Sequence, residues 1–116
     1  MPPPSQIAIA TSVLNRLVKE ERSYHKEAEH QQASIAKLEQ GGGDENADFT
    51  LRQERNALEQ TKAMFTELKT KIRDALTRLE QQLEQDKGPG DQSSPEDITK
   101  AKEAVAGALT AIREAS

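Results

Sequence analysis

Apolar residues recur at heptad spacing through residues 6–40, a 35-residue stretch without glycine or proline. Eight of the ten positions along this seam are apolar or aromatic, and the positions between them are mostly charged or polar. A helix with one apolar stripe is stabilised by packing that stripe against a partner. The pattern therefore predicts a long helix over residues 6–40 that lies against other helices. Its seam is Ile7, Ala10, Leu14, Leu17, Glu21, Tyr24, Ala28, Gln31, Ile35 and Leu38.

A second seam runs through residues 48–87 and changes register once. After Ile72 the better apolar positions become Leu76, Leu79 and Leu83, a one-residue slip that a 3.6-residue helix produces against a seven-residue count. We predict a second helix over these residues whose buried face rotates at the slip, with Asp48 as its N-cap. The seam is Leu51, Glu54, Leu58, Thr61, Phe65, Leu68, Ile72, Ala75, Leu79 and Gln82.

A third, shorter helix is predicted over residues 95–114. Ser94 is its N-cap, proline follows at the first helical position and acidic residues come next, where free backbone N–H groups point. Ser5 is the corresponding N-cap of the first helix. Gly107 costs about 1 kcal/mol relative to alanine, so we expect this helix to be the least stable. Its apolar positions are Ile98, Ala101, Val105, Ala108, Leu109 and Ile112.

Glycine-rich connections at residues 41–47 and 88–94 separate the helices. A glycine just past the last seam residue supplies the left-handed conformation that ends a helix, and short connections make successive helices antiparallel neighbours. No segment alternates with the period of two that a strand requires. The sequence predicts an all-α fold, an elongated antiparallel three-helix bundle with coiled-coil-like packing, in which residues 1–116 form a single domain.

The composition fits a thin bundle better than a compact globule. Hydrophobic residues make up 34% of the chain, aromatic residues 3% and charged residues 31%, with a net charge of −4. Disorder is the alternative reading of low hydrophobicity, but the regular seams favour order. The absence of cysteine excludes disulfides and thiolate metal sites. No secretory signal and no apolar run near the roughly 20 residues of a membrane span is visible, so we expect a cytoplasmic protein.

Candidate chemistry is sparse. His25 and His30 lie about 140° apart around a helix and cannot share one metal, and a Glu-x-x-His element at residues 27–30 lacks the second copy that di-iron bundles need. Glu21 falls on the seam and is expected to pair with a basic group of another helix. Basic residues of the second helix are interspersed with acids, which disfavours nucleic-acid binding. We expect no catalytic, cofactor-binding or metal site, and no enzyme activity.

One outer surface of the first helix has a single sign of charge. The outward positions between 15 and 26 include four basic residues and no acidic one, while Glu20 and Glu27 lie on the flank. Such a strip is either a solvated face or a surface for an acidic protein partner. The candidate partner-binding residues are Arg16, Lys19, Glu20, Arg22, Lys26 and Glu27.

The order and spacing of several motifs resemble the tubulin-binding cofactor A family. In the first helix the resemblance is carried by Arg16-Leu17-Val18-Lys19-Glu20, Tyr24, Lys26-Glu27-Ala28 and Gln31. In the second helix it is carried by Arg52-Gln53, Leu58-Glu59-Gln60-Thr61, Met64 and residues 76–84. It covers most of residues 6–87 and weakens in the third helix. Each motif alone is a common helical string, and their combination makes the assignment specific.

The resemblance implies a three-helix cytosolic chaperone that captures β-tubulin released from the chaperonin and holds it for assembly of the α/β-tubulin heterodimer. It implies no nucleotide, no catalysis, an indirect link to other tubulin-folding cofactors, a cytoskeletal association, and either a monomer or a homodimer. Thr66 stands where many relatives have a proline, so a proline kink should not be carried over. The alternative is a structural coiled-coil module that pairs with another helical protein.

Overall fold

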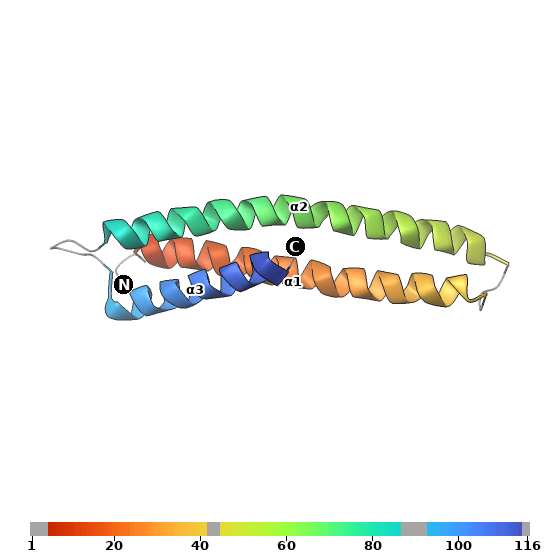
Figure 1. Cartoon of the computed structure of the whole chain (residues 1–116), viewed down its shortest axis with the longest axis horizontal. Helices are drawn as coiled ribbons and strands as arrows, with labels where there is room; N and C mark the ends of the chain where they lie inside the picture. Colours follow the sequence, from red (N-terminus) through yellow and green to blue (C-terminus); the bar gives the residue numbers. More distant parts are fainter. Residues whose placement is uncertain (1–4, 42–44, 87–92, 115–116) are drawn as a thin grey trace. The chain divides into compact units, whose positions relative to one another are not determined.

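The computed structural model describes residues 5–41, 45–86 and 93–114 (Figure 1). These residues form three helices, α1 (Gln6–Glu39), α2 (Ala47–Gln85) and α3 (Pro95–Glu114), and no strand. The predicted all-α fold with three antiparallel helices is confirmed, and every helix end lies within the ordinary one or two residues of its predicted place. The predicted loop residues 42–44 and 88–92 lie outside the described residues.

The helices contribute to two compact units. Unit 1 consists of Met1–Glu20 and Leu68–Ser116, and unit 2 consists of Glu21–Glu67. Unit 1 therefore holds the first part of α1, the last part of α2 and all of α3, whereas unit 2 holds the remaining parts of α1 and α2. That residues 1–116 form a single domain stays a prediction.

Unit 1 is a three-helix bundle around an aliphatic core. The core takes residues from all three helices, and Leu14, Ile72 and Leu79 are its largest fully buried side chains. In Figure 1, α3 lies beside the first part of α1 and the last part of α2. The Ser5 hydroxyl donates a 3.1 Å hydrogen bond to Asp97 Oδ2, so α1 and α3 begin at the same end of the bundle.

Small residues form the buried face of α3. Ala101, Ala104 and Ala108 are buried at helical spacing and allow the helix backbone to lie close to its neighbours. The predicted seam position Leu109 is wrong, because this side chain is 44% exposed. Leu109 follows Ala108 directly, so its side chain lies about 100° further around the helix axis and points away from the core. Ala104, which the predicted seam omitted, is buried instead.

Unit 2 is a pair of helix segments with a polar seam. Glu21, Gln31 and Thr61 are buried there together with Ala28 and Ile35. Most of the larger apolar side chains are only half-buried, because two helices can cover only one side of each other. These half-buried residues include Tyr24, Leu38, Leu51, Leu58, Met64 and Phe65.

The predicted seams are confirmed as the inward faces of both long helices. All ten seam positions of α1 and all ten of α2 are buried or half-buried. The predicted slip in α2 is also confirmed, because Leu76 is buried at 6% exposure while its neighbour Ala75 is only half-buried. α2 continues as one helix through Thr66, without the break that a proline there would favour.

Most predicted helix ends are confirmed by their hydrogen bonds. The Ser5 hydroxyl accepts from the Ala8 N–H at 3.1 Å, and the Ser94 hydroxyl accepts from the Asp97 N–H at 3.1 Å. Each serine thus satisfies a donor that the first helical turn leaves free. Gly41 has a φ of 80°, the left-handed conformation predicted for the residue that closes α1.

The predicted N-cap of α2 is wrong. The helix begins at Ala47, which places Asp48 inside the first turn rather than before it. Asn46 stands just before the helix, and its carbonyl accepts from the Thr50 N–H at 3.0 Å. Asp48 still supports the helix, because a carboxylate in the first turn interacts favourably with the helix dipole.

Candidate partner-binding surfaces

The six residues predicted to bind a partner are all exposed. Arg16, Lys19 and Glu20 belong to unit 1. The remaining residues, Arg22, Lys26 and Glu27, belong to unit 2. Within the described part of the chain, the four basic side chains make no hydrogen bond or ion pair. In both units, these basic side chains can therefore bind a partner without first losing a hydrogen bond or an ion pair within the chain.

Glu27 is the one predicted residue with a side-chain contact. Its Oε1 accepts a 3.3 Å hydrogen bond from Gln31 Nε2, one helical turn further along α1. The bond orients the carboxylate of Glu27 along the helix surface. It also gives the buried amide of Gln31 one of the partners that a buried polar group requires.

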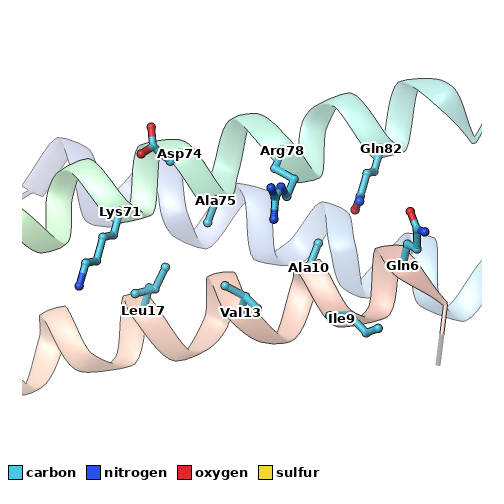
Figure 2. A pocket seen from close by; sticks show the side chains of 10 residues that line it. All are labelled: Gln6, Ile9, Ala10, Val13, Leu17, Lys71, Asp74, Ala75, Arg78 and Gln82. Carbon is cyan, nitrogen blue, oxygen red and sulfur yellow. The ribbon is translucent and has the colours of Figure 1, made fainter. Parts of the chain in front are cut away.

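A groove of about 470 Å³ lies between α1 and α2 in unit 1, and we call it the α1–α2 groove (Figure 2). The wall formed by α1 is apolar and carries Ile9, Val13 and Leu17 at intervals of four residues. Ile9 is 52% exposed, although it is a large aliphatic residue. The groove is therefore an apolar surface that the three helices of unit 1 leave uncovered.

The wall formed by α2 is mainly polar and charged. In Figure 2, the side chains of Lys71 and Arg78 extend from α2 toward α1, whereas Asp74 points away from α1. Gln6 and Gln82 line the end of the groove nearest the start of α1. The groove therefore combines an apolar α1 wall with two basic side chains and one acidic side chain from α2, and of these three only Asp74 points away from α1.

The heptad pattern did not predict this groove. It assigned Leu17 to the core and left Ile9 and Val13 unassigned, because neither falls on the seam. A signal was present, since Ile9, Val13 and Leu17 form a second apolar row at i, i+4 and i+8 beside the seam. An apolar sector wider than one seam is typical of a helix that buries more than the narrow stripe of a coiled coil.

Two further grooves in unit 1 have a different character. The groove between α1 and α3 is lined by hydroxyl, amide and charged groups, including Ser12, Asn15 and Lys100. The groove between α2 and α3 has carboxylates along its α2 wall, including Glu80 and Glu84. The α2–α3 groove also has apolar side chains beside Lys102. The α1–α2 groove differs from it in having two basic residues, rather than several carboxylates, on its α2 wall.

Unit 2 contains a polar cluster that links its two helix segments. Glu21 Oε1 contacts His25 Nε2 within α1, and the His25 ring stacks on Phe65 of α2 with a centroid distance of 4.4 Å and an interplanar angle of 21°. The prediction that Glu21 pairs with a basic group of another helix is wrong. Its partner lies one turn away on the same helix, and the contact across the helices is made by the two rings.

No metal site or membrane span was found in the described ranges. Among residues 5–41, 45–86 and 93–114, no group of three or more His, Cys, Asp or Glu side chains could hold a metal ion. None of the three described helices is long and apolar enough to cross a membrane. That the chain has no catalytic or cofactor-binding site stays a prediction.

Comparisons with known proteins give consistent similarities. The family model described as Tubulin binding cofactor A matches residues 2–105. Tubulin-specific chaperone A of Saccharomyces cerevisiae is 34% identical over 106 residues, which cover 90% of this chain and 92% of the yeast protein. Tubulin-folding cofactor A of Arabidopsis thaliana is 32% identical over 100 residues, covering 86% of this chain and 85% of the plant protein. The crystal structure of tubulin folding cofactor A from Arabidopsis thaliana superposes with a TM-score of 0.76 at 30% identity, covering 90% of this chain and 92% of that one.

Proposed function

The chain belongs to the tubulin binding cofactor A family, and we propose that it acts as a tubulin-folding chaperone. The observation that carries this proposal is the extent of the similarity. The family model spans residues 2–105, and relatives named for tubulin folding match along nearly their whole length. A similarity of that extent reaches into all three helices rather than covering one helical motif.

The client is a β-tubulin folding intermediate released from the chaperonin. The chaperone holds this subunit until it can be assembled into the α/β-tubulin heterodimer, and it is linked to other tubulin-folding cofactors through that client. It acts in the cytoplasm, in association with the cytoskeleton, as a monomer or a homodimer. This work needs a binding surface and neither a nucleotide nor a catalytic group.

The basic residues of α1 supply the electrostatic part of client binding. Arg16 and Lys19 do so in unit 1, and Arg22 and Lys26 do so in unit 2. Their exposure and their single sign of charge support this assignment, because complementary charges steer encounter and exclude wrong partners. Glu20 and Glu27 flank these basic residues. They repel an acidic segment of the client that is shifted out of register with the basic residues.

The test is capture of tubulin diluted from denaturant, compared with capture of the native heterodimer. The wild-type chain should enrich the free β subunit over the heterodimer. Reversing a basic pair should weaken capture by about ten-fold at low salt, and the difference should shrink as salt screens the charges. The reversed pairs are Arg16→Glu with Lys19→Glu, and Arg22→Glu with Lys26→Glu.

Matched controls separate the position of a charge from the net charge of the chain. Each control makes the same charge change at exposed residues of the same unit. The controls are Arg73→Glu with Lys102→Glu for unit 1, and Arg52→Glu with Lys62→Glu for unit 2. Equal capture by a reversed pair and its control would remove that pair from the binding surface and leave the chaperone function standing. No enrichment of tubulin by the wild-type chain would instead favour the structural coiled-coil module.

A further inference from the structure

We propose that the α1–α2 groove of unit 1 binds an amphipathic helix whose apolar stripe is flanked by acidic side chains. The identification of that helix as part of the tubulin client rests on the proposed function. The chemistry of the helix follows from the groove alone, from its length, its apolar wall and the charges at its opening.

The length of the groove suits a short helix. Its α1 wall extends from Gln6 to Leu17, which corresponds to a rise of about 17 Å or about three helical turns. α3 packs into the core of unit 1 through Ala101, Ala104 and Ala108, and none of its residues lines this groove. The groove is therefore the open place for a fourth helix beside α1 and α2, in the helix-in-groove manner that many amphipathic segments use.

The apolar wall gives the helix its anchoring stripe. A single exposed isoleucine on a protein surface is ordinary. Ile9, however, continues into Val13 and Leu17, one turn apart along the same wall. Such a row forms the ridge against which residues at i, i+3, i+4 and i+7 of a second helix pack. Burying these partly exposed side chains would stabilise the complex.

The cationic groups give the helix its charge. Lys71 and Arg78 are seven residues apart, about two turns of α2, and both reach toward α1 in Figure 2. Carboxylates two turns apart on the incoming helix would meet these cations, and arginine is the residue best suited to a bidentate contact. Asp74 also lines the groove, but its side chain points away from α1 in Figure 2.

The same charges disfavour a second copy of this chain as the occupant. If two α1–α2 grooves faced each other, Lys71 and Arg78 of one copy would approach the same cations of the other. Like charges brought together at an interface cost free energy. A partner with acidic side chains has no such penalty.

The first test uses two designed helical peptides of about 14 residues, which span about 21 Å as helices. Both carry a leucine stripe, flanked by glutamates in one and by lysines in the other. Titrations into the full chain are followed by the amide NMR signals of Ile9, Val13 and Ala75. We expect these signals to move with the glutamate peptide, and the lysine peptide to bind at least about ten-fold more weakly.

Two variants with matched controls locate the contacts. Arg78→Glu should reverse the preference between the peptides, whereas Arg73→Glu, an exposed arginine of α2 outside the groove, should keep it. Ile9→Glu should weaken both peptides by about ten-fold. Leu109→Glu makes the same change at the 44% exposed leucine of α3 and should leave binding within about two-fold. Circular dichroism identifies any variant that loses helix, in which case Ile9→Gln replaces Ile9→Glu.

Three results of the peptide titrations would refute the inference. They are equal binding of the two peptides, no binding at about 1 mM, and signal changes confined to α3. Movement of the same signals on concentrating the chain alone would show that a second copy occupies the groove, which also refutes it. Ile9→Glu in the tubulin capture assay extends the test to the client. If the wild-type chain captures no tubulin, the proposed function fails while the peptide result stands. If tubulin capture is as strong with Ile9→Glu as with Leu109→Glu, the identification of the bound helix as part of the tubulin client fails, while the proposed function stands.

Discussion

The two units of this protein are made from the same two long helices but have different interiors. Unit 1 adds α3 and buries Leu14, Ile72 and Leu79 almost completely. The described residues of unit 2, 21–41 and 45–67, include segments of two helices only, and three of the five buried residues among them are polar. A third helix encloses an aliphatic core, whereas two helices leave most large apolar side chains half-exposed.

The different interiors of the two units affect how stably each unit is folded more than they affect whether its helices form. Each half-buried leucine in unit 2 contributes only part of the roughly 1.5–3 kcal/mol that full burial gives. The buried Glu21 offsets some of that gain, because a buried carboxylate must be compensated by partners. Unit 2 is therefore expected to open more readily than unit 1, as regions with few buried apolar contacts do.

The largest expected effect separates the two interiors directly. Leu79→Ala in unit 1 removes a fully buried side chain and should lower the free energy of unfolding by about 3 kcal/mol. Leu58→Ala makes the same change at a half-buried position of unit 2 and should cost about 1 kcal/mol. Urea denaturation followed by circular dichroism measures both. Equal losses would mean that the two interiors contribute equally to stability.

A smaller effect concerns the buried carboxylate of unit 2. Glu21→Leu should raise the free energy of unfolding by about 1–2 kcal/mol, because an apolar side chain on the seam needs no hydrogen-bond partner. Glu20→Leu, on an exposed neighbour, is the control and should change stability by less than about 0.5 kcal/mol. A loss of stability in Glu21→Leu would show that the contact with His25 outweighs the cost of burying the carboxylate.

The smallest effect compares one substitution at two glycines. Gly107→Ala in α3 should raise the free energy of unfolding by about 0.8 kcal/mol, since alanine is the better helix former and the added Cβ would meet nothing within 4 Å apart from the local helix backbone. Gly41→Ala should lower it by about 1 kcal/mol, because the φ of 80° is strained for any residue with a Cβ. Thermal unfolding of both variants checks the signs, and changes of the same sign would contradict this account.

Sequence patterns predicted the helices because the responsible interactions are local. The seams, the capping serines at positions 5 and 94 and the closing glycine at position 41 each act within one or two helical turns. The N-cap of α2 was misplaced because Asp48 and Asn46 are both good capping residues. Local preference alone does not decide between two candidates so close together.

The candidate sites were predicted less completely than the helices. The six candidate partner-binding residues of α1 are exposed as expected, but the α1–α2 groove was not predicted. Its apolar wall is visible in the sequence as a second row beside the seam. The charge of the groove is not visible in the sequence, because Lys71, Asp74 and Arg78 alternate in sign along α2. Only the structure shows that Lys71 and Arg78 extend toward α1 while Asp74 points away from it.

The sequence by itself determined that this chain forms three helices, which face of each turns inward, and where the face of α2 rotates. Those properties depend on the spacing of residues along one helix. With 3.6 residues per turn, that spacing fixes the direction in which each side chain points around the helix axis. Only the tertiary structure decided that Leu109 is exposed, that Glu21 meets His25, and that unit 1 leaves a groove open. The physical reason is that periodicity sets a direction around one helix axis, whereas the distance and tilt of the neighbouring helix decide what a side chain touches.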